Sequence, residues 1–372
     1  MALFSGTLQP SHPNVRCVVE PRYLEIHEQE LQHHPMRTYH PLQPVLLTQP
    51  SPLLRHDGPL YETIPVDFGS CGVCELKVYR VRSVSQGTVP AIVWCSEGEL
   101  FVTSPLSMMV GLIVIGGNMM PGDIDGESSV LSRLCHDAQC IIISVANRSV
   151  WEHPYKASIN DVFMMYNWVY QNQEDLGING TICLGGVAAG ASLALSTLLQ
   201  RAELGLSLPA VLVMVAPAQL DHTVTAENLT KWNNMQPPPG SGPDAAIEFP
   251  LPFLPNVPYQ SNWVQNPMRV PDEVLEKISL PPVFCLTMGS DLLSGAADFM
   301  CERMYNAGHT VREEIFKGLP YLPLGTTQVF PEAYEEMKNG FVKMFDVDMK
   351  LFAGLSWPPE EEDQDFDSRG RL

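Results

Sequence analysis

Positive charge is scarce in this chain of 372 residues. Lys and Arg together number 22 against 42 Asp and Glu, which gives a formal net charge of −20 at pH 7. A surface this acidic repels the phosphates of nucleic acids and of anionic lipids, so we expect neither as a partner. The chain also lacks an apolar run of about twenty residues, and we therefore expect no transmembrane segment.

A secretory leader and a paired cysteine framework are missing as well. The first residues, MALFSGTLQP, have neither the basic nor the apolar region of a signal peptide, and the nine cysteines are scattered and odd in number. These features favour a cytoplasmic protein with reduced thiols. Cys71 and Cys74 form a single C-x-x-C without a second pair, so we interpret them as part of a β-hairpin rather than as a zinc site. We expect no metal and no cofactor.

Apolar runs typical of buried strands alternate with stretches of helical character along most of the chain. The expected strands are 75–82, 90–95, 111–115, 140–145, 182–184, 210–215, 283–287 and 311–316. The expected helices are 127–135, 157–171, 189–198, 296–306 and 332–352. This alternation predicts an α/β fold with a mostly parallel central sheet that is covered by helices on both faces.

Composition divides the chain into regions. Residues 1–60 are rich in Pro, His and Gln and are expected to form an N-terminal cap, and residues 61–355 hold the α/β domain. Within it, the Pro-rich stretch 221–280 breaks the alternation and predicts a lid insertion over the strand ends. Residues 356–372 include an acidic run and are expected to be a disordered tail.

The sequence TICLGGVAAGASLA, at residues 181–194, is the centre of the chain's organisation. An apolar run enters a turn of small residues, and an Ala- and Leu-rich helix leaves it, which is the context of a nucleophile elbow, G-x-S-x-G. Here the five positions read GVAAG, so Ala188 carries a methyl group where the attacking hydroxyl would be. We interpret the segment as a hydrolase elbow that lacks its nucleophile, and we expect residue 188 to have a positive φ angle.

Four segments in order resemble the hormone-sensitive-lipase branch of the α/β-hydrolases, and the similarity covers residues 60–355. IGGNM (115–119) stands at the family's HGGGF, and SVANRSVWEHPYKASIND (144–161) is similar to SVDYRLAPEHPFPAALED. In addition to the four, GVAAGA at the elbow (186–191) stands at the family's GDSAGG. LPPVFCLTMGSDLL (280–293) resembles LPPALVVTAGLDPL, and YNAGHTVREEIFKGLPYLP (305–323) resembles the family's ending around HGF. The resemblance implies an α/β-hydrolase fold.

The resemblance also implies a degenerate catalytic triad. It places the family's acid at Asp291 and its base histidine at Tyr321, beside the alanine at position 188. A phenol with a pKa near 10 is a poor base at pH 7, and His309 precedes the last strand, so no substitute base is available. We therefore expect no ordinary serine-esterase activity. A loop-bracing role for Asp291 and a packing role for Tyr321 are the alternatives.

The family's oxyanion segment, HGGGF, falls on residues 115–119, which continue without a gap into 144–161. Backbone N–H groups here could still bind a carbonyl oxygen, because such a hole needs no side chain. The residues of the expected oxyanion and ligand site are Gly116, Gly117, Asn118, Ala188 and Ala189. Its expected apolar lining is Met119, Met120, Met235 and Phe253. Ser96–Glu99, which follows the strand at 90–95, is the alternative oxyanion segment.

Two classes of function remain open at this point. The first is a non-hydrolytic protein that binds an apolar carbonyl-containing small molecule, or that catalyses its cyclisation, elimination or rearrangement, in specialised metabolism. The resemblance supports this class, because the family includes plant receptors and enzymes that no longer hydrolyse. The second is a scaffold or regulatory protein with a vestigial pocket. Weak esterase activity is a third interpretation, and the resemblance leaves a homodimer open.

Overall fold

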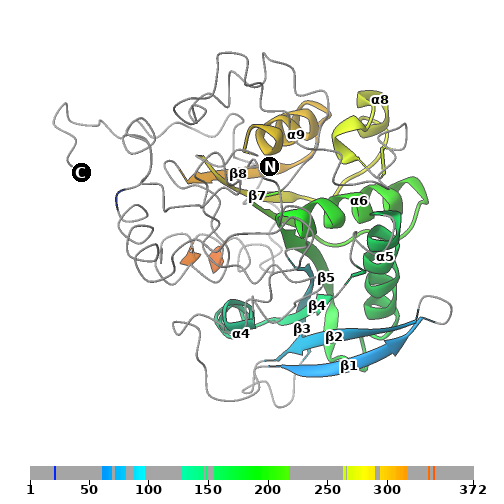
Figure 1. Cartoon of the computed structure of the whole chain (residues 1–372). Helices are drawn as coiled ribbons and strands as arrows, with labels where there is room; N and C mark the ends of the chain where they lie inside the picture. Colours follow the sequence, from blue (N-terminus) through cyan, green and yellow to red (C-terminus); the bar gives the residue numbers. More distant parts are fainter. Residues whose placement is uncertain are drawn as a thin grey trace, which may run out of the picture.

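The computed structural model describes residues 21, 61–68, 72–80, 88–96, 128–145, 147–148, 155–217, 263–264, 266–289, 294–316, 334–335 and 338–339. Within this part of the chain, strands form an eight-stranded sheet in the order β1-β2-β4-β3-β5-β6-β7-β8 (Figure 1). The strands are β1 (Glu62–Asp67), β2 (Val73–Tyr79), β3 (Val89–Cys95), β4 (Ile141–Val145), β5 (Ile178–Val187), β6 (Leu212–Val215), β7 (Val283–Met288) and β8 (Val311–Phe316).

The sheet is mostly parallel, as the alternation predicts. β1 pairs with β2 and β2 with β4 in antiparallel fashion, and every later neighbour in the sheet is parallel. Parallel neighbours require crossover connections, which helices supply. The helices are α4 (Ser128–Asp137), α5 (Tyr155–Gln171), α6 (Ala189–Glu203), α8 (Asp272–Leu275) and α9 (Ser294–Asn306), with the 3₁₀ turn η5 (Pro267–Arg269).

The central strands are apolar on both faces because both faces are covered. In β3, Ala91, Val93 and Cys95 belong to one core cluster, whereas Ile92 and Trp94 belong to the other. This split follows the two-residue period of a strand, in which successive side chains point to opposite faces. It explains why β3 reads as a continuous hydrophobic run rather than as an alternating one.

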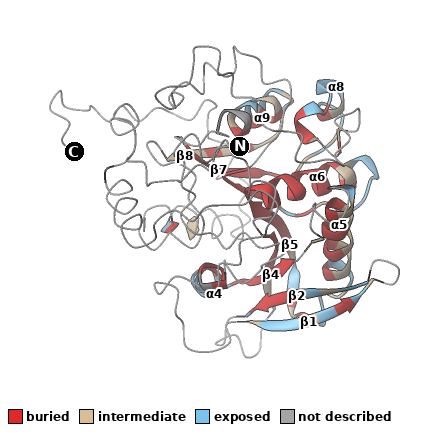
Figure 2. Ribbon diagram, viewed as in Figure 1, coloured by how far each residue is buried: buried red, intermediate tan, exposed pale blue. Residues whose placement is uncertain are grey.

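Helices cover the sheet unequally. α5, α6 and α9 contribute buried side chains to the first core cluster, whereas α4 and Tyr334 contribute to the second (Figure 2). α6 is buried along almost its whole length. This is expected for the helix that leaves the elbow, since it packs against β5 and β6 of the sheet and also against α5 and η5.

A buried arginine joins α5 to α6. Arg201 is 2% exposed, and its guanidinium donates to the side-chain oxygen of Asn167 and to the carbonyl of Ser207. It also lies over the ring of Tyr166, with its Cζ 4.5 Å from the ring centroid. These contacts satisfy a charge that burial would otherwise penalise, and they anchor the C-terminal end of α6.

The expected elements are largely confirmed, with boundaries that shift by a few residues. β1 has no range among the expected strands, although it pairs antiparallel with β2 as the hairpin expected around Cys74 requires. The expected strand at 111–115 lies outside the described residues, as do the tail at 356–372 and, apart from Pro21, the cap at 1–60. Of the expected helix 332–352, the described residues Tyr334, Glu335, Lys338 and Asn339 are helical.

The described end of the expected lid insertion packs into the domain core. Met268, Val270 and Leu275 are buried in the cluster that α5, α6 and α9 share. The guanidinium of Arg303 on α9 donates to the carbonyl oxygens of Met268 (2.8 Å) and Val270. Residues 266–280 therefore form part of the helical layer. No helix within the described ranges is long and apolar enough to cross a membrane.

Candidate functional site

The turn between β5 and α6 has the geometry of a nucleophile elbow. Ala188 separates the two elements and has φ 51° and ψ −119°, which confirms the predicted positive φ. An alanine pays about 1–3 kcal/mol for such a conformation, so the surrounding structure must hold it there. One contact that stabilises this conformation is the hydrogen bond from the Ala188 N–H group to the Val215 carbonyl, at 3.0 Å.

The two elbow glycines are required by backbone packing. A Cβ on Gly190 would overlap the carbonyl oxygens of Cys95 and Ser96, and a Cβ on Gly186 would lie 2.6 Å from the Cys95 oxygen. The elbow therefore presses directly against the end of β3. Since only glycine fits at either position, the G-x-x-x-G spacing is explained by the close approach of the elbow backbone to the end of β3.

The methyl group at the elbow is enclosed by apolar side chains. Ala188 is 5% exposed and belongs to the core cluster that includes Val215, Ala216 and Met288. A methyl group has no lone pair to attack a carbonyl carbon and no proton to transfer. The elbow position can therefore supply shape and backbone groups, but it cannot supply a nucleophile.

A second strained residue follows the neighbouring strand. Ala216 comes directly after β6 and has φ 42°, and its N–H group donates to the Leu286 carbonyl at 2.7 Å. Two non-glycine residues with positive φ thus lie at the same edge of the sheet, after β5 and β6. Strain of this kind clusters at functional sites. Nothing in the sequence pointed to Ala216 beyond its position after an expected strand.

Two serine hydroxyls meet at this edge as well. Ser96, directly after β3, and Ser144, in β4, are both buried, and their Oγ atoms lie 2.9 Å apart. Ser96 begins the alternative oxyanion segment, and its carbonyl lies against Gly190. β3 is therefore the strand beside the elbow. The preferred residues Gly116, Gly117 and Asn118 lie outside the described part of the chain.

An ion pair holds the chain where it leaves β4. Arg148 donates from Nη2 to one oxygen of Asp161 at 2.7 Å and from Nε to the other at 2.9 Å. The backbone N–H of Arg148 donates to the same carboxylate, and Ser158 Oγ donates to the Arg148 carbonyl. Asp161 is fully buried, so loss of its partner would cost about 3–5 kcal/mol. The resemblance matches both members of this pair.

The other expected site residues cannot be placed from the described structure. Asp291, Tyr321 and the expected apolar lining (Met119, Met120, Met235, Phe253) all lie outside it. His309 is described and stands before β8, where its Nε2 lies 2.9 Å from the Leu275 carbonyl oxygen. The N-terminal end of a parallel strand is at the opposite edge of the sheet from the elbow. His309 is therefore not a base for this site.

The start of α6 provides polar groups next to the methyl. Ala189 is the first residue of the helix, where backbone N–H groups have no carbonyl within the helix to bind. The aligned peptide dipoles also place about half a positive charge at this end. Together these features favour an electron-rich oxygen, such as that of a carbonyl or a carboxylate.

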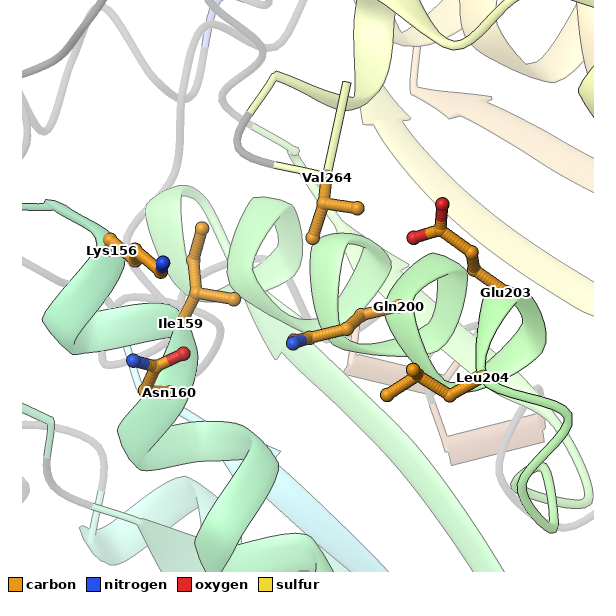
Figure 3. Close-up of a pocket in the computed structure, with 7 residues that line it drawn as sticks. All are labelled: Lys156, Ile159, Asn160, Gln200, Glu203, Leu204 and Val264. Atoms are coloured by element: carbon orange, nitrogen blue, oxygen red, sulfur yellow. The ribbon is translucent and has the colours of Figure 1, made fainter. Parts of the chain in front are cut away.

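A hollow of about 150 Å³ lies elsewhere, between α5, α6 and Val264 (Figure 3). Gln200 and Glu203 line it from the C-terminal end of α6. At 1.5 Å per residue, Gln200 is about 18 Å along the helix from the elbow. The hollow is therefore a separate surface feature and not the elbow site. The lining residues are Lys156, Ile159, Asn160, Gln200, Glu203, Leu204 and Val264.

Similarity to known proteins agrees with the elbow geometry. The family model Abhydrolase_3, an alpha/beta hydrolase fold, matches residues 112–322. An AB hydrolase superfamily protein of Schizosaccharomyces pombe is 28% identical over 209 residues, or 55% of this chain and 60% of that protein. Esterase LipI of Mycobacterium tuberculosis is 26% identical over 239 residues, or 62% and 70%. The chain thus spans about three fifths of the yeast protein's length.

Solved structures show the same fold. A thermostable esterase from Pseudomonas putida superposes with a TM-score of 0.65 at 18% identity, covering 88% of this chain and 97% of that one. A hyperthermophilic esterase from Pyrobaculum calidifontis gives a TM-score of 0.59 at 21% identity, covering 76% and 85%. Because the family model spans more than half of the chain, this protein belongs to the α/β-hydrolase superfamily, in its hormone-sensitive-lipase branch.

Proposed function

We propose that this protein is a non-hydrolytic α/β-hydrolase relative that acts on an apolar small molecule with a carbonyl group. It either binds the molecule or catalyses its cyclisation, elimination or rearrangement in specialised metabolism. The observation that carries the proposal is the strained elbow at Ala188, which keeps its geometry while presenting a methyl group. Acyl transfer in this fold needs a hydroxyl at that position, whereas ligand binding does not.

The polar groups around the elbow support a carbonyl ligand. The first turn of α6 offers N–H groups and a positive dipole end to an electron-rich oxygen. In the sequence, Asp291 follows the last residue of β7 by three positions, and Tyr321 follows β8 by five. Parallel strands end at the same edge of the sheet, so both residues belong to segments that leave the sheet on the elbow's side. In an enzymatic version, Tyr321 and Asp291 exchange a proton with a ligand held by the N–H groups.

The test combines ligand identification with an active-site probe. The full chain is purified without detergent, and small molecules released by denaturation are identified by mass spectrometry. A stoichiometric apolar carbonyl compound that rebinds to the stripped protein would support the proposal. The same protein is treated with a fluorophosphonate, which labels activated serines. Stoichiometric labelling of any serine would overturn the proposal in favour of a hydrolase with non-standard residues.

One observation favours a scaffold or regulatory role as the second candidate. The elbow methyl is 5% exposed and packed among core side chains, as it would be if the pocket had closed. A scaffold of this kind would release no small molecule and would bind none of the recovered compounds. The two candidates are therefore separated by the same mass-spectrometry experiment.

A further inference from the structure

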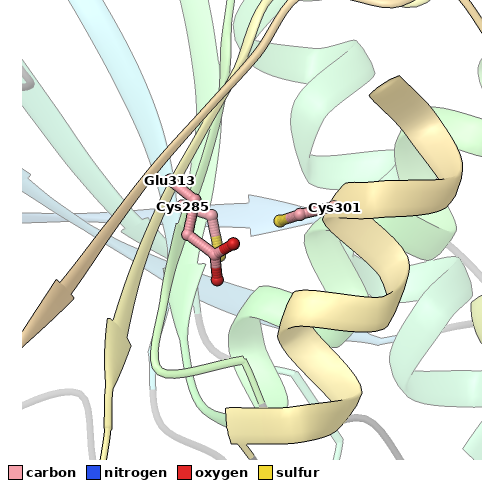
Figure 4. A group of neighbouring side chains, drawn as sticks. All are labelled: Cys285, Cys301 and Glu313. Carbon is pink, nitrogen blue, oxygen red and sulfur yellow. The ribbon is translucent and has the colours of Figure 1, made fainter. Parts of the chain in front are cut away.

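Two thiols and a carboxyl group meet in the core between β7, β8 and α9. Cys285 and Glu313 are register partners on the neighbouring parallel strands β7 and β8, and Cys301 lies on α9. Cys285 and Cys301 have no exposed surface, and Glu313 is 4% exposed. Figure 4 shows Cys285 and Glu313 side by side on the sheet, with the Cys301 sulfur directed toward them from the helix.

The ligand atoms of this group are close to the spacing of a metal site. The two sulfurs and a carboxylate oxygen all lie within 4.8 Å of one another. Around a tetrahedral zinc ion, with Zn–S near 2.3 Å and Zn–O near 2.0 Å, ligand atoms are about 3.3–3.8 Å apart. Movements of about 1 Å, within the reach of side-chain rotation, would close the remaining difference.

The carboxyl group is poorly satisfied by the protein alone. Glu313 Oε1 accepts a hydrogen bond from Thr287 Oγ1 at 3.2 Å. Its Oε2 atom is buried and meets no N–H or hydroxyl group of the described residues, and the group beside this carboxyl is a second acid, Asp298. A buried oxygen of this kind is costly, and a bound cation is one way to satisfy it.

A second carboxyl group lies beside Glu313. It belongs to Asp298, on the turn of α9 that precedes Cys301. A bound divalent ion stabilises carboxylates and thiolates in their charged forms, so it would relieve the contact between two acidic groups in the core.

We propose that Cys285, Cys301 and Glu313 bind a zinc ion. Asp298, which lies beside Glu313 on the turn of α9 before Cys301, is the protein group available for the fourth position once its side chain rotates toward the ion. Thiolates select a soft or borderline cation over calcium or magnesium, and a carboxylate disfavours copper(I), which leaves zinc as the best match. A closed set of four protein ligands is typical of structural sites. The ion would fasten α9 to β7 and β8, and thereby fix the helix that follows Asp291 in the chain.

The first test measures metal in the full chain. Protein purified without chelators is expected to hold about one zinc per chain by plasma mass spectrometry. After denaturation with a chelator and refolding with Co²⁺, the thiolate–cobalt charge-transfer band and the strong visible bands of tetrahedral cobalt should appear. A refolded chain that retains less than about 0.1 equivalents of zinc or cobalt after gel filtration would overturn the proposal.

Variants then assign the site. Cys301→Ala and Glu313→Gln should each bring bound metal below about 0.2 equivalents and weaken the cobalt bands. Cys183→Ala, a change at a buried cysteine of β5, is the matched control and should retain the metal. Cys285→Ser, which is nearly isosteric, replaces Cys301→Ala if that variant does not fold. Equal metal loss in the Cys183→Ala control, or full retention in Cys301→Ala, would contradict the assignment.

Discussion

Position 188 separates the shape of an active site from its chemistry. The backbone there has the strained conformation of an elbow, and the side chain that would react is a methyl group. A preference of alanine for this conformation cannot explain the strain, because glycine adopts a φ of 51° at a lower conformational energy than alanine does. Packing explains it, since the elbow is clamped between the Val215 carbonyl and the end of β3.

Restoring the nucleophile alone should not restore a hydrolase. Ala188→Ser supplies a hydroxyl without a base, and Tyr321→His supplies a base with nothing to activate. With both changes, and with Asp291 as the orienting acid, the triad order of the family is complete. Residues that act as a unit are non-additive, so the double variant should exceed either single variant by at least about tenfold.

The measurement is the initial rate on p-nitrophenyl acetate and butyrate for wild type, both single variants and the double variant. Both single variants should remain within about twofold of background. If Ala188→Ser alone matches the double variant, a group other than residue 321 acts as the base. The assignment of the histidine position to Tyr321 would then be wrong.

A methyl group at Gly190 should be far more damaging than a methyl group elsewhere. Gly190→Ala would drive a Cβ into the carbonyl groups of Cys95 and Ser96, and the Cys95 carbonyl carbon would be only 2.7 Å away. We expect a loss of at least about 3 kcal/mol in the free energy of unfolding, measured by denaturant titration. The control is Gly205→Ala, which has open space and a φ of 64°, and should cost about 1 kcal/mol. Equal costs would show that backbone conformation, and not close approach, requires Gly190.

At the scale of elements, the sequence predicted the buried strands and the helices between them. A short, continuous apolar run such as Ile141–Val145 clearly indicates a buried strand, because a strand covered on both faces must be apolar throughout. The range of β1 was not predicted, because it is an edge strand, largely exposed, with a proline in the middle. The group of Cys285, Cys301 and Glu313 escaped prediction because its members come from three elements and have no ligand spacing along the chain.

The turn that joins α9 to β8 should respond to acid. Burial holds the pKa of His309 below its usual value, although the hydrogen bond to the Leu275 carbonyl partly offsets this effect. Below about pH 6.5 the unfolded chain binds a proton more readily than the folded chain does, so stability falls as pH falls. Wild type should therefore lose more stability than His309→Gln between about pH 7.5 and 5.5.

Unfolding free energies from urea titrations across this pH range would test the effect. Glutamine can still donate to the Leu275 carbonyl, so the variant removes the titration and keeps the hydrogen bond. His136→Gln, on the exposed surface of α4, is the matched histidine control. A difference between wild type and His309→Gln that stays constant with pH would contradict the prediction.

At the scale of the whole molecule, repulsion between like charges opposes the compact state. Acidic residues outnumber basic ones by 42 to 22. Ion pairs such as those of Arg148 with Asp161 and Arg303 with Asp272 use some of the few cations, and the remaining carboxylates repel one another. The family fold accommodates this charge because its core is built from buried apolar strands and does not depend on surface pairs.

Salt should therefore stabilise the protein. Between about 10 mM and 150 mM sodium chloride the Debye length falls from about 30 Å to about 8 Å, which screens the repulsion. We expect the thermal midpoint to rise by about 2 °C or more, measured by circular dichroism. Tetramethylammonium chloride at the same ionic strength should act equally, which distinguishes screening from sodium binding. A falling midpoint would mean that attractive pairs dominate.

The contacts of Gly186 and Gly190 bear on how this chain can evolve. Selection for stability alone keeps both positions as glycine, whatever the protein's function, because any larger side chain would collide with backbone atoms at the end of β3. Position 188 is free of this steric constraint, since a small side chain fits there whether or not it reacts. A single substitution at position 188 can thus remove or restore the reactive hydroxyl during evolution while the fold is retained. The glycines of such a chain therefore indicate its ancestry, but they do not indicate its present function.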